Sequence, residues 1–111
     1  MSEMEQTDRI NQLVSALRDE NEALRDHAAA TLGQMGLEAL PQLMSLLADE
    51  DVVIREATTS AIVRMGPAVV EPMIEALRED EWSVREQAAS ALGKLKDPRG
   101  VEPLVRADVA E

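Results

Sequence analysis

The chain has 111 residues, 45% of them hydrophobic and Trp82 the only aromatic one, so a single domain with an aliphatic core is expected. Its 22 Asp and Glu against 11 Lys and Arg give a formal net charge of -11, which disfavours nucleic acid as a partner because binding phosphates requires clustered cations. The lack of Cys excludes disulfides and thiolate metal sites, and the lack of a long apolar run argues against membrane contact, so we expect a soluble, cytoplasmic protein.

An amphipathic helix is predicted first, over residues 7–18, because apolar side chains recur there at the spacing of one helix face: Ile10, Leu13, Val14 and Leu17. Ser2 and Glu5 have the spacing of a capping box ahead of it. A turn at 19–21 leads to a second helix over 22–35, which Gly36 ends. We expect this second helix to bury Leu24, Ala28, Thr31, Leu32 and Met35.

The same pair of helices then recurs along the chain. Further helices are predicted over 37–48, 52–65, 67–78, 82–95 and 98–110, seven in all, and no stretch has the sustained alternation of a strand. We call 22–35, 52–65 and 82–95 the first-type helices and the other four the second-type helices. Equivalent apolar positions lie thirty residues apart, as in Ile10/Leu40/Val70, Leu17/Leu47/Leu77, Leu24/Ile54/Val84 and Leu32/Ile62/Leu92. Such a period is typical of a solenoid.

The predicted domain spans 1–111 and divides into a half repeat (1–18), two repeats (19–48 and 49–78) and a last repeat with a C-terminal cap (79–111). Small residues at 28–30, 58–60 and 88–90 predict that the first-type helices pack side by side. One extra residue near 97–100 places Asp108 in the column of Leu17, Leu47 and Leu77. Because burying a carboxylate is costly, we interpret Asp108 as part of a polar cap.

The last repeat carries a family resemblance in two runs, VREQAASALGKL at 84–95 and DPRGVEPL at 97–104. They resemble the HEAT-like repeats first associated with phycobilin lyase subunits, and the resemblance extends over 10–106. It implies an all-α, right-handed superhelix of about three and a half helix pairs. The family includes lyase subunits, scaffolds, a di-iron hydroxylase and DNA-repair glycosylases, so the site must be argued separately.

Two of these activities do not fit the sequence. Hydroxylase-like members carry repeated His-Glu pairs, whereas the single histidine here, His27, is followed by Ala28. Glycosylase-like members need a cationic face, which this acidic chain lacks. His27 also has no companion ligands for a zinc site or a triad. We therefore expect no catalytic residue, no metal, no cofactor and no enzymatic activity of the chain by itself; a bilin lyase subunit stays open.

An arginine column, Arg25, Arg55 and Arg85, lies beside the acidic turns that start each repeat. Three guanidinium groups in register could bind an anion, but pairing with the turns is the simpler interpretation. The turns lack the Gly and the distant Glu of a calcium-binding loop, so their carboxylates are expected to cap helices. The residues given a structural role are Arg25, Arg55, Arg85, Asp19, Asp49 and Asp51.

The outward side of the second-type helices is the predicted binding surface, because stacked helices of a solenoid form an extended face. Its candidate residues are Asn11, Gln12, Ser15, Gln42, Ser45, Glu71, Glu75, Glu102 and Arg106. Trp82, at the start of a first-type helix, is either a packing residue or a binding anchor. A solvated face without a partner is the alternative.

The sequence thus predicts a protein interaction module that binds another protein with a basic or mixed-charge surface, and neither nucleic acid nor membrane. The chain itself is expected to be a monomer or a weak homo-oligomer. Two alternatives stay open: a subunit of a bilin or other tetrapyrrole lyase complex, and a self-associating structural protein.

Overall fold

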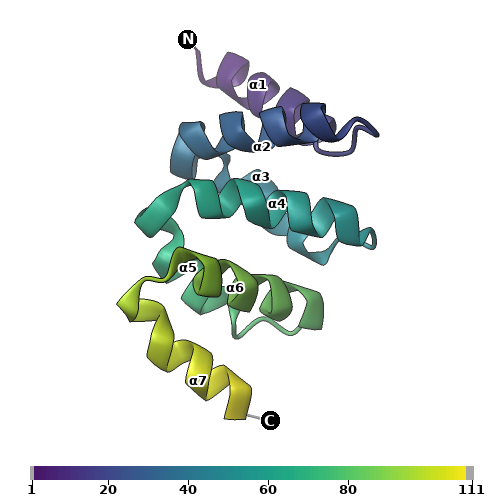
Figure 1. The fold of residues 1–111 in the computed structure, drawn as a ribbon. Helices are drawn as coiled ribbons and strands as arrows, with labels where there is room; N and C mark the ends of the chain where they lie inside the picture. The colour runs from purple at the N-terminus through teal and green to yellow at the C-terminus, as the bar shows by residue number, and fades with distance from the viewer. Residues whose placement is uncertain (1, 110–111) are drawn as a thin grey trace.

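The computed structural model describes residues 2–109, with side chains up to residue 107 (Figure 1). These residues form no strand; they form α-helices and short 3-10 segments, which confirms the all-α expectation. The α-helices are α1 (Glu3–Ala16), α2 (Glu22–Met35), α3 (Leu40–Met44), α4 (Val52–Arg64), α5 (Val70–Ala76), α6 (Trp82–Leu95) and α7 (Val101–Val109). The 3-10 segments are η1 (Gly36–Ala39), η2 (Ser45–Ala48), η3 (Gly66–Val69) and η4 (Pro98–Gly100).

The helices stack in a row from the N-terminus to the C-terminus, which gives an elongated molecule of 42 × 27 × 23 Å (Figure 1). The first-type helices α2, α4 and α6 pack one against the next, as the small-residue blocks predict. The second-type helices α1, α3, α5 and α7 form the other layer, in which α1 contacts α2 and α5 contacts α6. The solenoid expectation is therefore confirmed.

Three second-type helices begin with a 3-10 turn where a continuous α-helix is predicted, and proline accounts for the difference. Pro41, Pro72 and Pro103 have no backbone N–H to donate to the carbonyl four residues earlier. Those carbonyls belong to residues of η1, η3 and η4, namely Leu37, Ala68 and Arg99. The lost α-helical hydrogen bond favours the tighter 3-10 turn at the start of each of these helices.

The ends of the other helices follow local signals. α1 begins at Glu3, earlier than predicted, because the Ser2 hydroxyl accepts a hydrogen bond of 3.2 Å from the Glu5 amide and caps it. α2 and α6 have the predicted bounds. Gly36 and Gly66 follow α2 and α4 with φ of +70° and +76°, a conformation that favours glycine.

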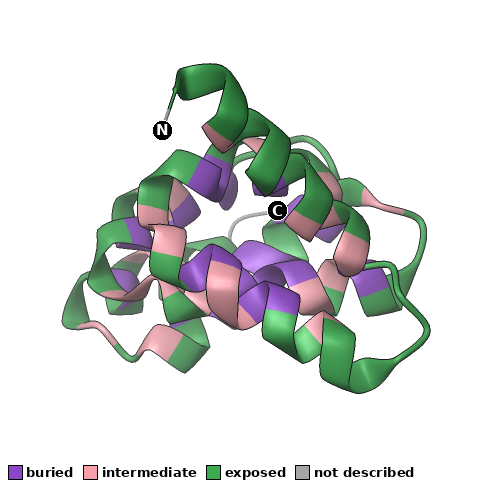
Figure 2. Cartoon of the chain, turned by 90° about the horizontal axis from the view of Figure 1, so that it is seen from above, coloured by how far each residue is buried: buried purple, intermediate pink, exposed green. Residues whose placement is uncertain are grey.

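The core consists of the recurring aliphatic columns. Buried segments face the interior between the helices in Figure 2. The columns Leu17/Leu47/Leu77 and Leu32/Ile62/Leu92 are buried in every copy. A buried hydroxyl adds one polar link between neighbouring first-type helices, where Thr59 of α4 donates to Oε1 of Gln87 in α6 at 2.7 Å.

The ends of the stack depart from the column pattern. Leu24 was expected to be buried, and this prediction is wrong: it is 49% exposed, whereas Ile54 in the same column is 3% exposed. Within residues 2–109, no first-type helix precedes α2 to cover Leu24. At the other end, Val101 is 61% exposed although its equivalent Val70 is fully buried, since no described helix follows α7. The interpretation of Asp108 as a cap lies outside the described side chains.

No helix in residues 2–109 is both long enough and apolar enough to cross a membrane.

α2 and α4 pack closely at Gly33. A Cβ atom added there would lie 2.5 Å from Cβ of Arg64 and 3.3 Å from the carbonyl oxygen of Ala61. We expect Gly33→Ala to lower the free energy of unfolding by about 1–3 kcal/mol, because two helix backbones must separate. Gly93 holds the equivalent place in α6 with nothing within 4 Å. Gly93→Ala should therefore raise the free energy of unfolding by about 0.5–1 kcal/mol, the gain of helix propensity. Urea titration of both variants tests this, and a loss in both would contradict it.

A second prediction concerns the column Leu24/Ile54/Val84, whose first member is exposed. Ile54→Ala removes a buried side chain and should cost about 2–4 kcal/mol of unfolding free energy. Leu24→Ala should cost less than about 1 kcal/mol, because its side chain is half in water. Thermal or chemical unfolding of the two variants measures the difference, and equal losses would show that Leu24 is covered in solution.

Candidate partner-binding surface

The nine candidate residues of the second-type helices lie on one layer of the molecule. Eight of them are exposed, and Gln42 is half-buried. Gln42 also has a buried Oε1 atom that accepts no hydrogen bond within the described part of the chain. The candidate residues are uncharged on α1, α3 and η2, acidic on α5, and of both signs on α7.

Trp82 lies apart from the nine candidate residues. It lies at the start of α6, in the layer of first-type helices, and 59% of its surface is exposed. The guanidinium carbon of Arg55 lies 5.8 Å from the centre of the indole ring, within range of a cation–π interaction. Trp82 thus joins α6 to α4 at their N-terminal ends, away from the candidate surface.

The arginine column binds the acidic turns through their backbone. Arg55 donates from Nη1 to the carbonyl oxygens of Asp49 and Glu50 at 2.6 and 3.2 Å. The pattern repeats for Arg25 with Asp19 and Glu20, and for Arg85 with Glu79 and Asp80. The acceptors are carbonyl oxygens and not the carboxylates that the sequence suggested.

Carboxylates of the first two turns instead accept bonds from the backbone. Asp19 accepts from the Asn21 amide at 2.8 Å, Asp49 from the Asp51 amide at 2.9 Å, and Asp51 from the Val53 amide at 2.9 Å. Asp49 also pairs with Arg18 at 2.6 Å, which links the C-terminal end of α1 to the turn before α4. The Asp51 amide and the Arg18 guanidinium lower the pKa of Asp49.

No group of three or more His, Asp or Glu side chains in residues 2–107 is placed to hold a metal ion. His27 is exposed on α2.

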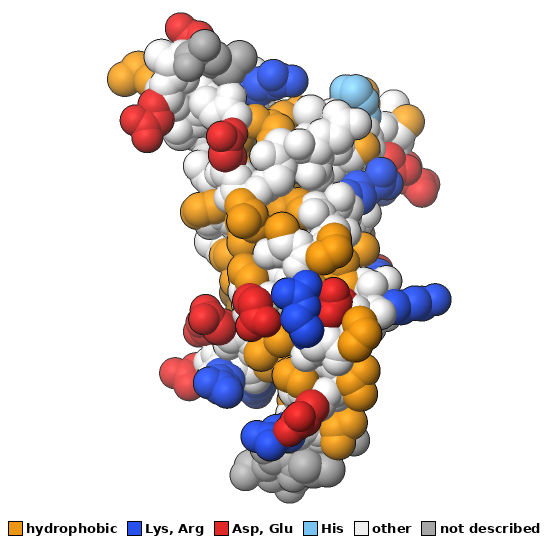
Figure 3. All heavy atoms as spheres, turned by 90° about the vertical axis from the view of Figure 1, so that its left-hand side faces the viewer, with side chains coloured by type: hydrophobic (Ala, Val, Ile, Leu, Met, Phe, Trp, Pro, Cys, Tyr) orange, Lys and Arg blue, Asp and Glu red, His pale blue; other side chains and the backbone are white. Residues whose placement is uncertain are grey.

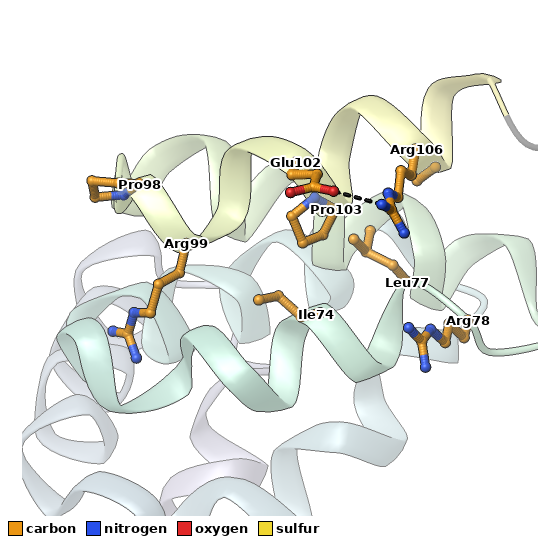
Figure 4. A pocket seen from close by; sticks show the side chains of 9 residues that line it. Ile74, Leu77, Arg78, Pro98, Arg99, Glu102, Pro103 and Arg106 are labelled. Atoms are coloured by element: carbon orange, nitrogen blue, oxygen red, sulfur yellow. Dashed lines mark ion pairs between the residues drawn. The ribbon is translucent and has the colours of Figure 1, made fainter.

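An open groove of about 500 Å³ lies between α5 and α7 (Figure 4). Ile74 of α5 and Leu77, directly after α5, lie opposite Pro103 of α7 and form an apolar floor (Figure 4), and Ala107 also lines the groove. Charged side chains surround this floor, with Arg99 toward one end of the groove and Arg78 and Arg106 toward the other (Figure 4). Among the described side chains, Glu102 is the only acidic one in the lining.

Ion pairs hold part of this charge in place. Arg106 Nη2 lies 2.6 Å from Glu102 Oε1 across one turn of α7. Arg99 bonds to both carboxylate oxygens of Asp97 at 3.0 Å and lies 3.9 Å from Glu71 of α5. The Arg99 side chain and amide lower the pKa of Asp97, and the carboxylate in turn raises the pKa of Arg99. Arg78 forms no ion pair within the described residues.

A second groove, of about 540 Å³, lies between α1 and the start of α3. Its lining includes Glu3, Gln6 and Thr7 of α1, Glu38 of η1 and Gln42 of α3, and no Lys or Arg. Gln6 donates to Glu38 at 2.5 Å. The two grooves occur at equivalent junctions, because Glu38 and Arg99 share one column and Gln42 and Pro103 share the next.

The groove between α5 and α7 was only partly predicted from sequence. Glu102 and Arg106 were named as candidates, whereas Arg78, Arg99 and the apolar floor were not. One signal was present: the column Asp8/Glu38/Ala68/Arg99 changes from acidic to basic in the repeat with the extra residue. Figure 3 shows acidic and basic side chains side by side over the lower, C-terminal half of one face.

The chain was compared with known proteins. A search of curated protein sequences gives no match. Among solved structures, it is similar to the complex of CpcE and CpcF of phycocyanin lyase from Nostoc sp. PCC7120, with 24% sequence identity and a TM-score of 0.59. That match covers 91% of this chain and 64% of the other, and at this identity it shows the fold alone. The family of HEAT repeats matches residues 2–63 and 41–109, so the chain belongs to the HEAT-repeat family.

Proposed function

We propose that this HEAT-repeat protein is an interaction module that binds another protein along its layer of second-type helices and performs no chemistry by itself. The observation that carries the proposal is the groove between α5 and α7. It opens on the same layer as the exposed candidate residues, and Glu102 and Arg106 belong to both. An apolar floor with charged borders is the usual composition of a protein-binding site.

The charges of this layer support a partner of mixed charge. Glu71 and Glu75 are exposed on α5, whereas Arg78, Arg99 and Arg106 line the neighbouring groove. The whole chain carries a formal charge of -11, so long-range attraction favours a partner with a basic region. Such attraction mainly raises the association rate and weakens with salt.

Charge reversal tests which layer binds. The double variant Glu71→Lys/Glu75→Lys should weaken capture of the native partner by about tenfold or more, a loss of about 1.4 kcal/mol or more. The matched control is Glu56→Lys/Glu86→Lys, which changes the charge equally on the exposed side of the first-type helices. Co-purification at matched salt, with quantification of the bound chain, measures the effect. Equal losses in the two variants, or none, would refute the assignment of this layer.

A lyase-complex subunit is the second candidate function, because the similar structure is a phycocyanin lyase complex. This candidate expects binding of a tetrapyrrole pigment or of a pigment-bearing protein, whereas the interaction-module proposal expects a colourless protein partner. Adding a bilin to the purified chain and recording its visible absorption separates the two. A saturable spectral shift that Arg78→Gln abolishes and Arg64→Gln preserves would favour the lyase-complex candidate.

A further inference from the structure

The two grooves of the second-type layer occur at equivalent junctions but carry opposite charge. Among the described residues, the groove at the α1–α3 junction contains Glu3 and Glu38 and no Lys or Arg. The groove at the α5–α7 junction contains three arginines and one glutamate. This contrast matters because the chain has only 11 Lys and Arg against 22 Asp and Glu, and three of these 11 cations line one groove.

We propose that the α5–α7 groove binds an acidic amphipathic helix of a partner protein, with an apolar side chain on the floor and carboxylates on the flanking arginines. The inference deepens the proposed function and rests on it, because the groove belongs to the same second-type layer. It also gives the partner a direction: its acidic end lies at α7, and its basic end lies toward the acidic groove beside α1.

The apolar floor determines what kind of segment fits. Ile74, Leu77, Pro103 and Ala107 offer no charge or hydroxyl group to a ligand. A hydrated inorganic anion would leave this floor in water, whereas a helix with an apolar stripe covers it. The groove is itself concave, so the occupant must be a protruding segment rather than the equally hollow junction at the other end of a second copy.

The arginines determine the charge of the occupant. Arg106 and Arg99 keep much of their side chains in water, 77% and 49% exposed. Arg106 pairs through Nη2 alone, whereas Arg99 uses Nε and Nη2 on Asp97 and on the carbonyl oxygen of Pro67 and keeps Nη1 for a partner. Arg78, without an ion pair in the described residues, adds a third cation at the same end as Arg106 (Figure 4). Guanidinium groups bind carboxylates in a bidentate geometry, so carboxylates beside the apolar stripe satisfy these donors.

A labelled peptide tests the proposal on the full chain. The probe is an acetylated helical peptide of about 14 residues, with Leu at i, i+3, i+4 and i+7 and Glu at the flanking positions, followed by fluorescence anisotropy. We expect it to bind at least about tenfold more tightly than the same peptide with Lys for Glu. We also expect binding to weaken between about 0.1 and 1 M salt.

Variants of matched charge locate the site. Replacing the three groove arginines (Arg78→Gln, Arg99→Gln and Arg106→Gln) should weaken peptide binding at least about tenfold. The control replaces three exposed cations outside the groove (Arg9→Gln, Arg64→Gln and Lys94→Gln) with the same change in net charge and should leave binding within about twofold. Circular dichroism and the melting temperature establish that both variants are folded.

Several outcomes would overturn the proposal. Equal binding of the Glu and Lys peptides, absence of binding, or equal losses in the two triple variants would each do so. Displacement of the peptide by inorganic phosphate, but not by chloride at matched ionic strength, would indicate a small-anion site instead. A solution mass above that of one chain that falls to one chain in the groove variant would indicate a second copy as the occupant.

The peptide assay tests the groove, and the capture assay tests the interaction layer, so the two proposals can fail independently. If the peptide does not bind but native capture still depends on Glu71 and Glu75, the assignment of the groove is wrong and the proposed function stands. If the peptide binds and reversal of both glutamates leaves capture unchanged, the interaction layer is wrong although the groove is real.

Discussion

The whole structure depends on the burial of aliphatic side chains between two layers of helices. The columns Leu17/Leu47/Leu77 and Leu32/Ile62/Leu92 supply the same contact in each repeat. Most helix contacts lie within a repeat or between adjoining repeats, and η2 of the repeat 19–48 also contacts α6 of the last repeat. The stack is therefore held together mainly by neighbouring repeats, which leaves one layer free to present a long face.

This dependence explains how much of the fold the sequence predicts. The period of thirty residues predicts the helix pairs, and α2 and α6 have the predicted bounds. Asn21 caps the start of α2, and residues with positive φ, Gly36 and Lys96, follow the two helices. At the two ends of the stack, the same columns predict burial wrongly. Leu24 and Val101 carry the core signal, but burial needs a neighbouring helix, which a residue's own position in the repeat does not reveal.

The candidate surface is a harder problem for the same reason. Outward columns identify Glu102 and Arg106 as exposed, because exposure follows from helix periodicity. The groove that they line depends on how far α7 lies from α5, and this distance follows from tertiary packing. η4 packs closely at its buried Gly100, where an added Cβ would lie 3.3 Å from Leu92. Beyond η4, α7 diverges from α5, so Ile74 and Leu77 form the floor of the groove between these two helices. The repeating columns of the sequence do not reveal this floor.

The arginine column has a consequence for how the surface can evolve. Each of these arginines donates hydrogen bonds to backbone carbonyl oxygens of the turn before its helix, as Arg85 does to Glu79 and Asp80. Every amino acid has a backbone carbonyl oxygen. These hydrogen bonds from the arginines therefore do not depend on which side chains the acceptor residues carry. Mutations at turn positions whose side chains form no capping bond, such as Glu50 and Asp80, can thus adjust the hydration and solubility of the molecule to the ionic strength of its surroundings, while the helix register stays the same.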